Sequence, residues 1–408
     1  MKILVFVGGT DGCTLHRILL PYQKIKDLNP ENLTIDFLKP TPNQPFEELI
    51  AATEGYDVFV YHRLLPDAMF EALKQKNLIL INDQDDNWEL NSTHPLYSTF
   101  RKQLSEKIKY QIRNCDYITC TTKLIANKIK ALNPNVAIFP NALEGVGQFK
   151  SVDSPNQYGR QVNSKPYIRI GWVGGSSHVA DIRMLEGVVN QLPQDVKDKV
   201  QFVLCGFDGG KRNTVYPDGH VETTDLPYSE TCWAEFERIF TDNYRNVSPA
   251  YKQWLLQFLP KINVETDEHY RRIWTKPIDS YATHFDQMDV VLIPLRKDFF
   301  NEVKSELKLV ESSIKHKAVI ISDVEPYTRL LKPLFDKGGT INPEGNVIAI
   351  GDNKGSSAWA KAITKLVRNP ELISTLSDNL SKLTAEGAEF DLNKVAKDRI
   401  EWLRGVNK

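Results

Sequence analysis

The sequence predicts an α/β protein built from two Rossmann-like domains that face each other across a cleft. Its 408 residues exceed what one hydrophobic core usually organises, so two domains are expected. Short runs rich in Val, Ile, Leu and Phe alternate with stretches of helical spacing, which is typical of parallel sheets covered by helices. Each half also opens with a strand, a glycine-containing turn and a helix, at GGTDG and at GWVGGSSH.

The expected strands form two groups, one in each half of the chain. In the first half the candidate strands are residues 2–7, 33–37, 57–61, 78–81, 117–119 and 136–139. In the second half they are residues 168–173, 201–205, 290–293, 318–322 and 347–350. Helices are expected between them, for example at residues 97–114 and 122–132. This alternation predicts one parallel sheet in each domain.

A polar stretch separates the two groups. Residues 145–166 are rich in Gly, Pro, Ser and Asn and show neither period, so they indicate an interdomain connection. We therefore assign residues 1–150 to an N-terminal domain, 151–166 to the linker and 167–390 to a C-terminal domain. Residues 207–273 are too long for a connection between a strand and a helix, and we expect an insertion there.

Composition and charge exclude several classes of protein. The balance of 51 basic and 52 acidic residues gives a net charge of -1, so nucleic acid is not the expected partner, although a local basic patch would be compatible with one. No apolar run reaches the ~18 residues of a membrane span or forms a signal peptide, which predicts a cytoplasmic protein. The five cysteines lack any C-x-x-C pair, so neither a disulfide framework nor a zinc site is indicated.

Two glycine turns are candidate ligand sites. In the first, Gly9 and Asp11 lie where backbone N–H groups at a helix start meet an anion or a sugar hydroxyl; a tight turn without a ligand explains them equally well. The second turn is more specific because four small residues leave its backbone open and two of them add hydroxyls, which suits a diphosphate. These residues are Gly174, Gly175, Ser176 and Ser177, and His178 follows them.

The stretch NEVKSELKLVESSIKHKAVIISD, residues 301–323, is the most informative part of the chain. Its pattern predicts a helix from about residue 303 to 315, with Lys304 and Ser305 in the first turn and Glu311 about two turns later. A lysine at a helix N-terminus binds phosphate well, and a carboxylate further along can bind two hydroxyls of a ribose. A solvated helix of alternating charge is the alternative.

The same stretch resembles glycosyltransferases of family four, which have the GT-B architecture. ESSIKHKAVIISD, residues 311–323, is similar to the end of their donor site, where the second glutamate of an E-x7-E element holds the donor ribose. The resemblance implies this role for Glu311. Val303 stands where the first glutamate is expected, and NEVKS is similar to the N-x-x-K-S variant of bacterial relatives. The implied replacements for the donor-sugar contacts are Asn301, Glu302 and Lys304.

The resemblance extends over most of the chain. GWVGGSSH is similar to the phosphate loop of the family's second domain, and residues 274–295 resemble the segment that passes the donor base. The implied fold is GT-B, with an acceptor-side first domain and a second domain that binds the donor. Residues 391–408 fit the terminal helix that crosses back to the first domain, with an ordinary C-terminal helix as the alternative. The resemblance implies no metal and no cofactor besides a nucleotide-diphosphate sugar as co-substrate.

The first domain contributes a polar segment, NDQDDNWELNSTHPLY at residues 82–97, directly after a strand. Open α/β sheets bind ligands at this edge, so we expect Asp85 and Asp86 to contact the acceptor or a sugar; capping a helix is the rival role. With Asp83 they could be mistaken for a metal-binding D-x-D motif. Three weaker candidates border the same edge: His62, Arg63 and His94.

These features together favour a glycosyltransferase that moves a sugar from a nucleotide-diphosphate sugar to a hydroxyl of a carbohydrate or another acceptor. Lys304 would stabilise the leaving phosphate and a group near Asp85 or Asp86 would position the acceptor. The resemblance implies retention of configuration and independence from metal. The alternatives are an epimerase or phosphorylase on the same fold, a glycosyltransferase acting on modified DNA, and a sugar-nucleotide-binding protein without activity, which Val303 motivates.

Overall fold

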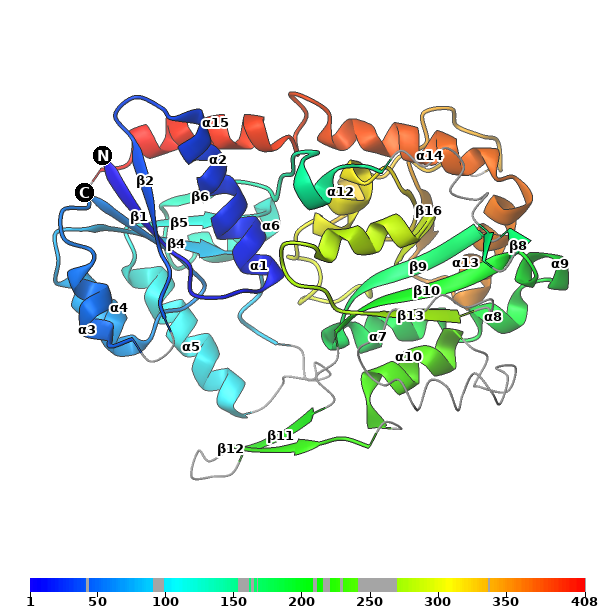
Figure 1. Ribbon diagram of the computed structural model, residues 1–408, viewed down its shortest axis with the longest axis horizontal. Helices are drawn as coiled ribbons and strands as arrows, with labels where there is room; N and C mark the ends of the chain where they lie inside the picture. Colours follow the sequence, from blue (N-terminus) through cyan, green and yellow to red (C-terminus); the bar gives the residue numbers. More distant parts are fainter. Residues whose placement is uncertain are drawn as a thin grey trace.

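The chain forms two α/β halves that lie side by side along the long axis of the molecule (Figure 1). The computed structural model describes residues 1–41, 44–90, 99–152, 161–162, 165–166, 168–207, 211–215, 221–227, 230–240, 270–336 and 338–407. Within this part of the chain each half holds a six-stranded parallel sheet, so the predicted fold class is confirmed. His94 lies outside the described residues.

The sheet of the first half has the strand order β2-β1-β3-β4-β5-β6. Its strands are β1 (Lys2–Phe6), β2 (Thr34–Leu38), β3 (Val58–His62), β4 (Ile79–Gln84), β5 (Tyr117–Cys120) and β6 (Val136–Ile138). In the register of the central strands, Val5 lies opposite Phe37 of β2 and Val60 of β3. The first four residues of β3 are all buried, which explains why it reads as a continuous apolar run.

Short helices connect and cover these strands. They are α1 (Gly12–Thr14), a π-helical turn (Leu15–Leu19), α2 (Leu20–Leu28), α3 (Phe46–Ala51), α4 (Asp67–Lys74), α5 (Thr99–Asn114) and α6 (Lys123–Lys130). Thr122 begins α6 as its N-cap, and its hydroxyl accepts the amide N–H of Ile125 at 3.3 Å. The helices expected at residues 97–114 and 122–132 are thus present, with slightly different bounds.

The sheet of the second half has the order β13-β10-β9-β14-β15-β16. Its strands are β9 (Ile168–Gly175), β10 (Val200–Phe207), β13 (Tyr270–Trp274), β14 (Val290–Ile293), β15 (Ala318–Asp323) and β16 (Ile348–Gly351). Its α-helices are α7 (Val179–Ile182), α8 (Val188–Gln191), α9 (Gln194–Lys197), α10 (Cys232–Phe240), α12 (Leu307–Ile314), α13 (Ser356–Arg368) and α14 (Glu371–Ser381). The strand order reverses between β9 and β14, and between β1 and β3 in the first sheet. Such reversals are where open α/β sheets bind ligands.

Two described elements of the segment expected as an insertion, residues 207–273, belong to the body of the second half. The first is β13, which begins at the end of that range and pairs in parallel with β10, with Phe202 opposite Tyr270, so it is the edge strand of the main sheet. The sequence concealed this strand because Arg271 and Arg272 interrupt its apolar pattern. Arg272 is nevertheless buried, and its Nη1 donates to Oε1 of Glu237 at 3.0 Å.

α10, also within the expected insertion, belongs to the body of the second half. Phe236 is buried against Trp172, with 5.3 Å between the ring centroids. By contrast, the hairpin of β11 (Lys211–Val215) and β12 (Val221–Asp225) projects away from the body (Figure 1). Only this hairpin therefore stands apart from the sheet among the described residues of that segment.

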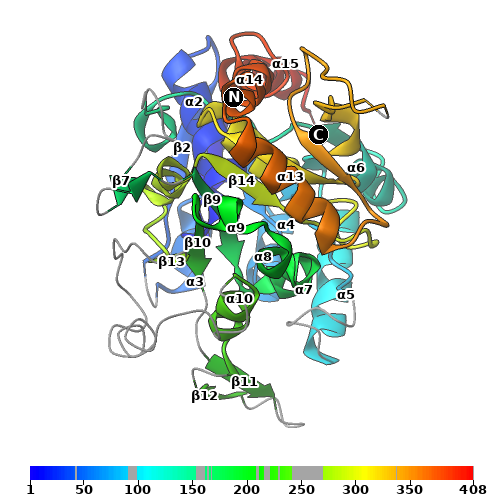
Figure 2. The same ribbon diagram turned by 90° about the vertical axis from the view of Figure 1, so that its right-hand side faces the viewer.

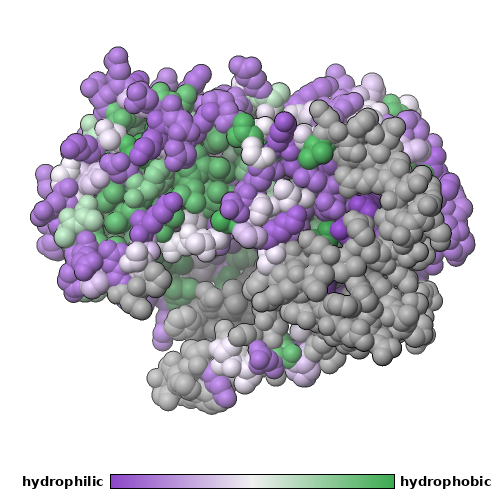
Figure 3. All heavy atoms as spheres, in the orientation of Figure 1, coloured by the Kyte–Doolittle hydropathy of each residue, from purple (hydrophilic) through white to green (hydrophobic). Residues whose placement is uncertain are grey.

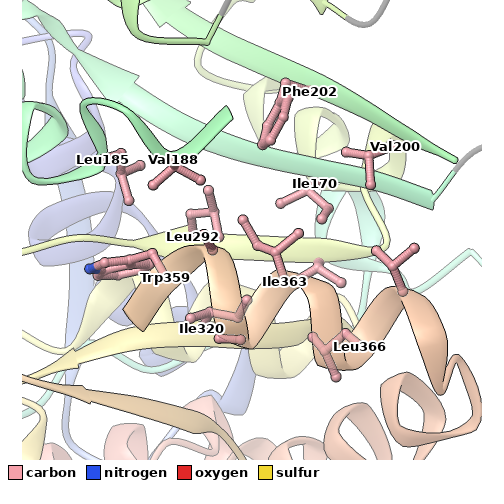
Figure 4. Close-up of a cluster of buried hydrophobic side chains, with 14 of the residues drawn as sticks. Ile170, Leu185, Val188, Val200, Phe202, Leu292, Ile320, Trp359, Ile363 and Leu366 are labelled. Atoms are coloured by element: carbon pink, nitrogen blue, oxygen red, sulfur yellow. The ribbon is translucent and has the colours of Figure 1, made fainter. Parts of the chain in front are cut away.

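The main core of the second half lies between its sheet and α13. Figure 2 shows α13 running across the sheet on the outer side of the molecule. Trp359, Ile363 and Leu366 of α13 are fully buried, and Figure 4 shows them facing Leu292 and Ile320 of the central strands. Burial of this apolar surface is the dominant force that holds the helix on the sheet.

The C-terminal helix α15 (Leu392–Arg404) packs against α2 of the first half (Figure 1). Leu403 is fully buried in a cluster that also contains Ile3 and Tyr22. Nη1 of Arg399 donates to the Tyr22 hydroxyl at 3.2 Å, and the Trp402 ring meets Tyr117 edge-on with 5.8 Å between centroids. The C-terminal helix thus completes the hydrophobic core of the first half.

On the face of the molecule seen in Figure 3, hydrophobic residues gather on the first half, with hydrophilic residues around them. Among the residues that the structure describes, none of the helices combines the length and apolar character needed to cross a membrane.

If α15 is part of the first core, truncating Leu403 should destabilise the whole protein. We expect Leu403→Ala to lower the free energy of unfolding by ~2–5 kcal/mol, because it leaves a buried cavity. Urea unfolding followed by circular dichroism measures this. Glu401→Ala, on the exposed face of the same helix, should stay within ~0.5 kcal/mol of the wild type. Equal effects of the two substitutions would contradict the packing described.

Candidate functional site

A pocket of about 470 Å³ lies between the two halves. Residues after β1, β3 and β4 of the first sheet and after β9, β14 and β15 of the second sheet line it. The pocket therefore lies at the carboxyl ends of both sheets and next to both reversals of strand order. Of the predicted site residues, the following line it: Arg63, Asp85, Asp86, Ser177, Lys304 and Ser305.

Asp85 is the best-paired carboxylate of the pocket. Its Oδ1 lies 3.0 Å from Nε2 of His62 and accepts a hydrogen bond from Nε of Arg63 at 2.8 Å. Burial alone would raise the pKa of Asp85, but Arg63 and His62 outweigh it and hold that pKa well below its usual range. Asp85 is therefore an anion that fixes Arg63, which adopts a left-handed backbone with φ 59°. His62 itself does not line the pocket.

Asp86 differs from its neighbour. Its Oδ1 accepts the amide N–H of Asn87 at 3.0 Å, and its Oδ2 lies 3.8 Å from Nη2 of Arg63. Burial raises the pKa of Asp86, although Lys304 and Arg63 oppose the shift. Asp86 is thus the more readily protonated of the two carboxylates. Its pKa responds to one charged residue from each half, Arg63 and Lys304.

Asp83 is buried, does not line the pocket and is bound by two other side chains. Arg17 binds it through two hydrogen bonds of 2.8 and 2.9 Å, and the hydroxyl of Thr119 donates to it at 2.6 Å. Arg17 also donates to Oδ1 of Asn141, whose Nδ2 donates to Oγ of Ser305 across the cleft at 2.9 Å. In the described parts of the chain, no group of three or more His, Cys, Asp or Glu side chains has a geometry that could hold a metal ion.

The predicted start of the lysine-bearing helix is wrong. α12 begins at Leu307, so Lys304 and Ser305 lie in the turn before it rather than in its first turn. Oδ1 of Asp298 accepts the amides of Phe300 and Asn301, at 3.0 and 2.9 Å, and these bonds hold the chain in a turn.

Asn301 and Val303 fix this turn instead of facing the ligand space. Nδ2 of Asn301 donates to the carbonyl oxygen of Arg296 at 2.9 Å and to Oδ1 of Asp181 at 3.2 Å. Val303 is only 4% exposed because it inserts into the core of the first half beside Trp88. Neither residue lines the pocket. Val303, where the resemblance expects a glutamate, therefore joins the two halves.

Two lysines line the pocket from the second half. Nζ of Lys304 lies 4.8 Å from the centroid of the Phe300 ring, and Nζ of Lys308 lies 4.8 Å from that of Trp172. Burial and the nearby Lys304 lower the pKa of Lys308 to about 8. Lys308 was not identified from the sequence, because a lysine at this position also fits a solvated helix of alternating charge. Its spacing of four residues from Lys304 was the available signal.

The glycine turn of the second half lies directly beside these lysines. β9 continues through Gly175 and is followed by a 3₁₀ turn, Ser176–His178. A Cβ atom at Gly174 would lie 2.4 Å from Cζ2 of Trp172 and 3.1 Å from Nζ of Lys308. The overlap with the indole ring of Trp172 therefore favours glycine at this position.

His178, next to Ser177 in the pocket, is held as a neutral imidazole. Burial, Lys308 and Lys304 lower the pKa of His178 to about 3, and its Nδ1 lies 2.9 Å from Oδ2 of Asp181. The pKa of Asp181 is lowered: burial opposes ionisation, but His178 and other contacts outweigh it. An ionised carboxylate accepts hydrogen bonds, so Nδ1 of His178 carries the proton and Nε2 is the acceptor.

Glu311 is buried in α12 and does not line the pocket. The hydroxyl of Tyr281 donates to its Oε1, and Nε2 of His16 lies 3.5 Å from the same oxygen. His16 itself lines the pocket and comes from the π-helical turn of the first half. A buried polar chain thus connects the predicted ribose ligand to the other half. Neither His16 nor Tyr281 stood out in the sequence.

The remaining candidates lie away from the pocket lining. Asp11 is the N-cap of α1, where its Oδ1 accepts the amide N–H of Thr14 at 2.9 Å. Gly9 lies in the tight turn before it, since a Cβ atom there would lie 2.9 Å from Oγ1 of Thr14. Glu302 and Gly175 also do not line the pocket.

No model of a known protein family matches the chain, and no curated protein matches it in sequence. Solved structures share its fold over nearly the whole length. The Anabaena protein HepE in complex with UDP-glucose matches with a TM-score of 0.60 and 12% identity, covering 100% of both chains. Sucrose-phosphate synthase from Thermosynechococcus elongatus has a TM-score of 0.62 and 14% identity, covering 99% of this chain and 98% of that one.

A third structure, an alpha-glucosyltransferase in complex with UDP-glucose and DNA containing an abasic site, has a TM-score of 0.58 and 13% identity over 99% of both chains. At these identities the likeness concerns the fold. The chain therefore has the GT-B fold, with its pocket between the two sheets.

The glycine turn should depend on Gly206 of the neighbouring strand. Gly206 has φ 144°, and a Cβ atom there would lie 1.6 Å from the carbonyl oxygen of Gly174. We expect Gly206→Ala to lower the free energy of unfolding by at least ~2 kcal/mol, as chemical denaturation would show. Gly355→Ala is the matched control, because its Cβ meets nothing within 4 Å and its φ is -76°. An unperturbed Gly206→Ala protein would refute the close approach of the two strands.

Proposed function

We propose that the protein is a glycosyltransferase that binds a nucleotide-diphosphate sugar at the second half and transfers the sugar to a hydroxyl of an acceptor held by the first half. The observation that carries the proposal is the pair of lysines, Lys304 and Lys308, that line the pocket near the end of β9, where Nζ of Lys308 lies beside Gly174. The UDP-glucose bound in two of the similar structures makes UDP-glucose the first donor to test.

The chemistry follows from the charges that develop during transfer. As the bond to the sugar breaks, negative charge grows on the leaving diphosphate, and cations preorganised in a partly dry pocket stabilise it most. Lys304 and the backbone of the turn at Ser177 lie where such stabilisation is useful. The neutral His178 presents an acceptor nitrogen, which suits a sugar hydroxyl rather than a phosphate oxygen.

The acceptor side is proposed from the first half of the pocket. Arg63 neutralises the charge of Asp85, and Asp85 in turn positions the Arg63 guanidinium. The carboxylate of Asp86, by contrast, has a raised pKa. The walls beyond them are apolar, with Trp88 and Leu104 among the lining residues. This arrangement supports a role of Asp86 in orienting the acceptor hydroxyl.

Three finer points belong to the same proposal. The likeness of ESSIKHKAVIISD to family four supports membership of that family and, with it, retention of configuration. Glu311 is proposed to bind the donor ribose, which requires the ribose hydroxyls to share or replace the contact from Tyr281. The pairing of Asp83 with Arg17 supports metal independence, because that carboxylate is already neutralised.

A sugar-nucleotide-binding protein without activity is the second candidate. Val303 favours it, because a hydrophobic residue that packs into the first half replaces a carboxylate of the resembling family. Turnover of UDP-glucose separates the two candidates, since a binder would retain affinity without forming free UDP.

Lys304 should act mainly in the transition state. We expect Lys304→Ala to lower kcat by ~10² or more, because a contact that strengthens as charge develops is lost. Steady-state kinetics of UDP release measure this, and Lys297→Ala, an exposed lysine seven residues earlier, is the matched control. Equal kcat values for the two variants would remove Lys304 from the reaction.

Glu311 should act on binding at least as much as on turnover. A ribose contact is made before and during the reaction, so Glu311→Gln should weaken nucleotide affinity by roughly 1–3 kcal/mol. Calorimetric titration with UDP measures the loss, after circular dichroism has shown native folding. Wild-type affinity in this variant would exclude the ribose role.

Transfer should not require a divalent cation. We expect the rate with UDP-glucose to survive excess EDTA, because the lysines supply the positive charge that a metal ion supplies elsewhere. Loss of activity that Mg²⁺ or Mn²⁺ restores would assign Asp85 and Asp86 to metal binding instead.

A further inference from the structure

Helix α5 of the first half brings an apolar stripe to one wall of the pocket. Leu104, Ile108 and Ile112 follow each other at intervals of four residues, so they share one face of the helix. Ile112 is fully buried in the core of the first half, and Ile108 is partly buried against that core. Leu104 and Ile108 also line the pocket. The stripe thus continues from the core into the pocket wall.

The segment after β4 is held beside the same helix. Nζ of Lys109 lies 3.1 Å from Oε1 of Glu89, the residue between Trp88 and Leu90. Both of these neighbours line the pocket, and Trp88 belongs to the core cluster that contains Ile112. Two segments of the first half therefore contribute apolar side chains to the pocket. We call these residues the apolar wall: Trp88, Leu90, Leu104 and Ile108.

Several polar side chains that the first half contributes to the pocket are already bound within the protein. Asp85 is paired with its two basic neighbours. Nε2 of Gln84 donates to the carbonyl oxygen of Arg63 at 2.8 Å, and Gln84 is only 1% exposed. Nδ2 of Asn87 donates to the carbonyl oxygen of Phe299 at 3.2 Å, and its Oδ1 accepts a backbone amide at 3.1 Å. These groups have little hydrogen-bonding capacity left for a ligand.

Arg63 and Asp86 remain accessible, with side chains that are 40% and 32% exposed. A ligand hydroxyl can therefore bind at Asp86, and the apolar wall lies in the same pocket. A sugar acceptor carries several hydroxyls, and each one that loses water against Leu104 or Ile108 without a new partner weakens binding. An apolar body instead gains from the same burial.

We propose that the acceptor is an alcohol or phenol whose hydroxyl is attached to an apolar body. The hydroxyl binds at Asp86 and the body packs on the apolar wall. This inference rests on the proposed function and names the acceptor class of that site. In the transfer, the bond between the anomeric carbon and the diphosphate oxygen breaks, the acceptor oxygen bonds to that carbon, and the hydroxyl proton is released to solvent.

Two hydroxyl compounds of similar size, 2-naphthol and glucose, test this acceptor class. We expect the UDP-saturated protein to bind 2-naphthol in a calorimetric titration. With UDP-glucose as donor, kcat/KM for 2-naphthol should exceed that for glucose by at least ~10-fold, with the glucoside detected by mass spectrometry. Failure of the UDP-saturated protein to bind 2-naphthol, or a higher kcat/KM for glucose, would overturn the proposal.

A substitution in the apolar wall locates the binding. We expect Leu104→Ser to weaken the binding of 2-naphthol by at least ~10-fold, because it removes apolar surface from the wall. Its affinity for UDP should stay that of the wild type, since Leu104 belongs to the first half. Gln103→Ser, at an exposed residue of the same helix that does not line the pocket, is the matched control. Equal affinities of Leu104→Ser and the wild type for 2-naphthol would place the compound elsewhere and refute the proposal.

The proposed function fails in a different way. A wild-type protein that does not bind UDP would overturn the proposed function itself. UDP binding combined with preferred transfer to glucose would leave that function intact and overturn this inference alone. If Leu104→Ser does not fold, the comparison of 2-naphthol with glucose in the wild-type protein decides.

Discussion

The repulsion between Lys304 and Lys308 is the physical constraint around which the pocket is built. Two cations near each other, beside a buried indole, are unfavourable unless an anion joins them, and the structure describes none within the pairing distance of Lys308. The nearby acid Asp181 is instead bound to His178 and to the turn before α12. The pocket at the carboxyl ends of the two sheets thus contains positive charge that the acid beside it does not neutralise.

Contacts between the halves keep this charge facing the pocket. The turn that carries Lys304 is anchored on the first half by Val303 and by the hydrogen bond between Asn141 and Ser305. Behind it, Tyr281 and Glu311 connect to His16 of the first half. These contacts fix the two halves of the chain on either side of the pocket before a ligand binds. This favours precise placement of donor and acceptor.

The sequence predicted the parts of the fold that obey a single strong pattern. Strands buried on both faces of a parallel sheet were recognised as apolar runs, and the two glycine segments were correctly placed at the carboxyl ends of β1 and β9. β13 was not predicted because Arg271 and Arg272 are buried through hydrogen bonds to other side chains, and the hydrophobic period of a sequence does not reveal such partners. The start of α12 was misplaced because the residues before Leu307 form turns, in which the amide N–H of Lys304 donates to the carbonyl oxygen of Asn301. Lys308 was missed because its significance depends on Trp172, a residue 136 positions away in the sequence.

A crystal structure of the protein grown with UDP is the most direct test of the central claim, that the lysines and the glycine turn form one diphosphate site. We expect the diphosphate to lie between Lys304, Lys308 and the backbone of residues 174–177, with both ammonium groups within ~3.2 Å of phosphate oxygens. UDP bound elsewhere on the protein, or in the pocket with its phosphates turned away from both lysines, would contradict it.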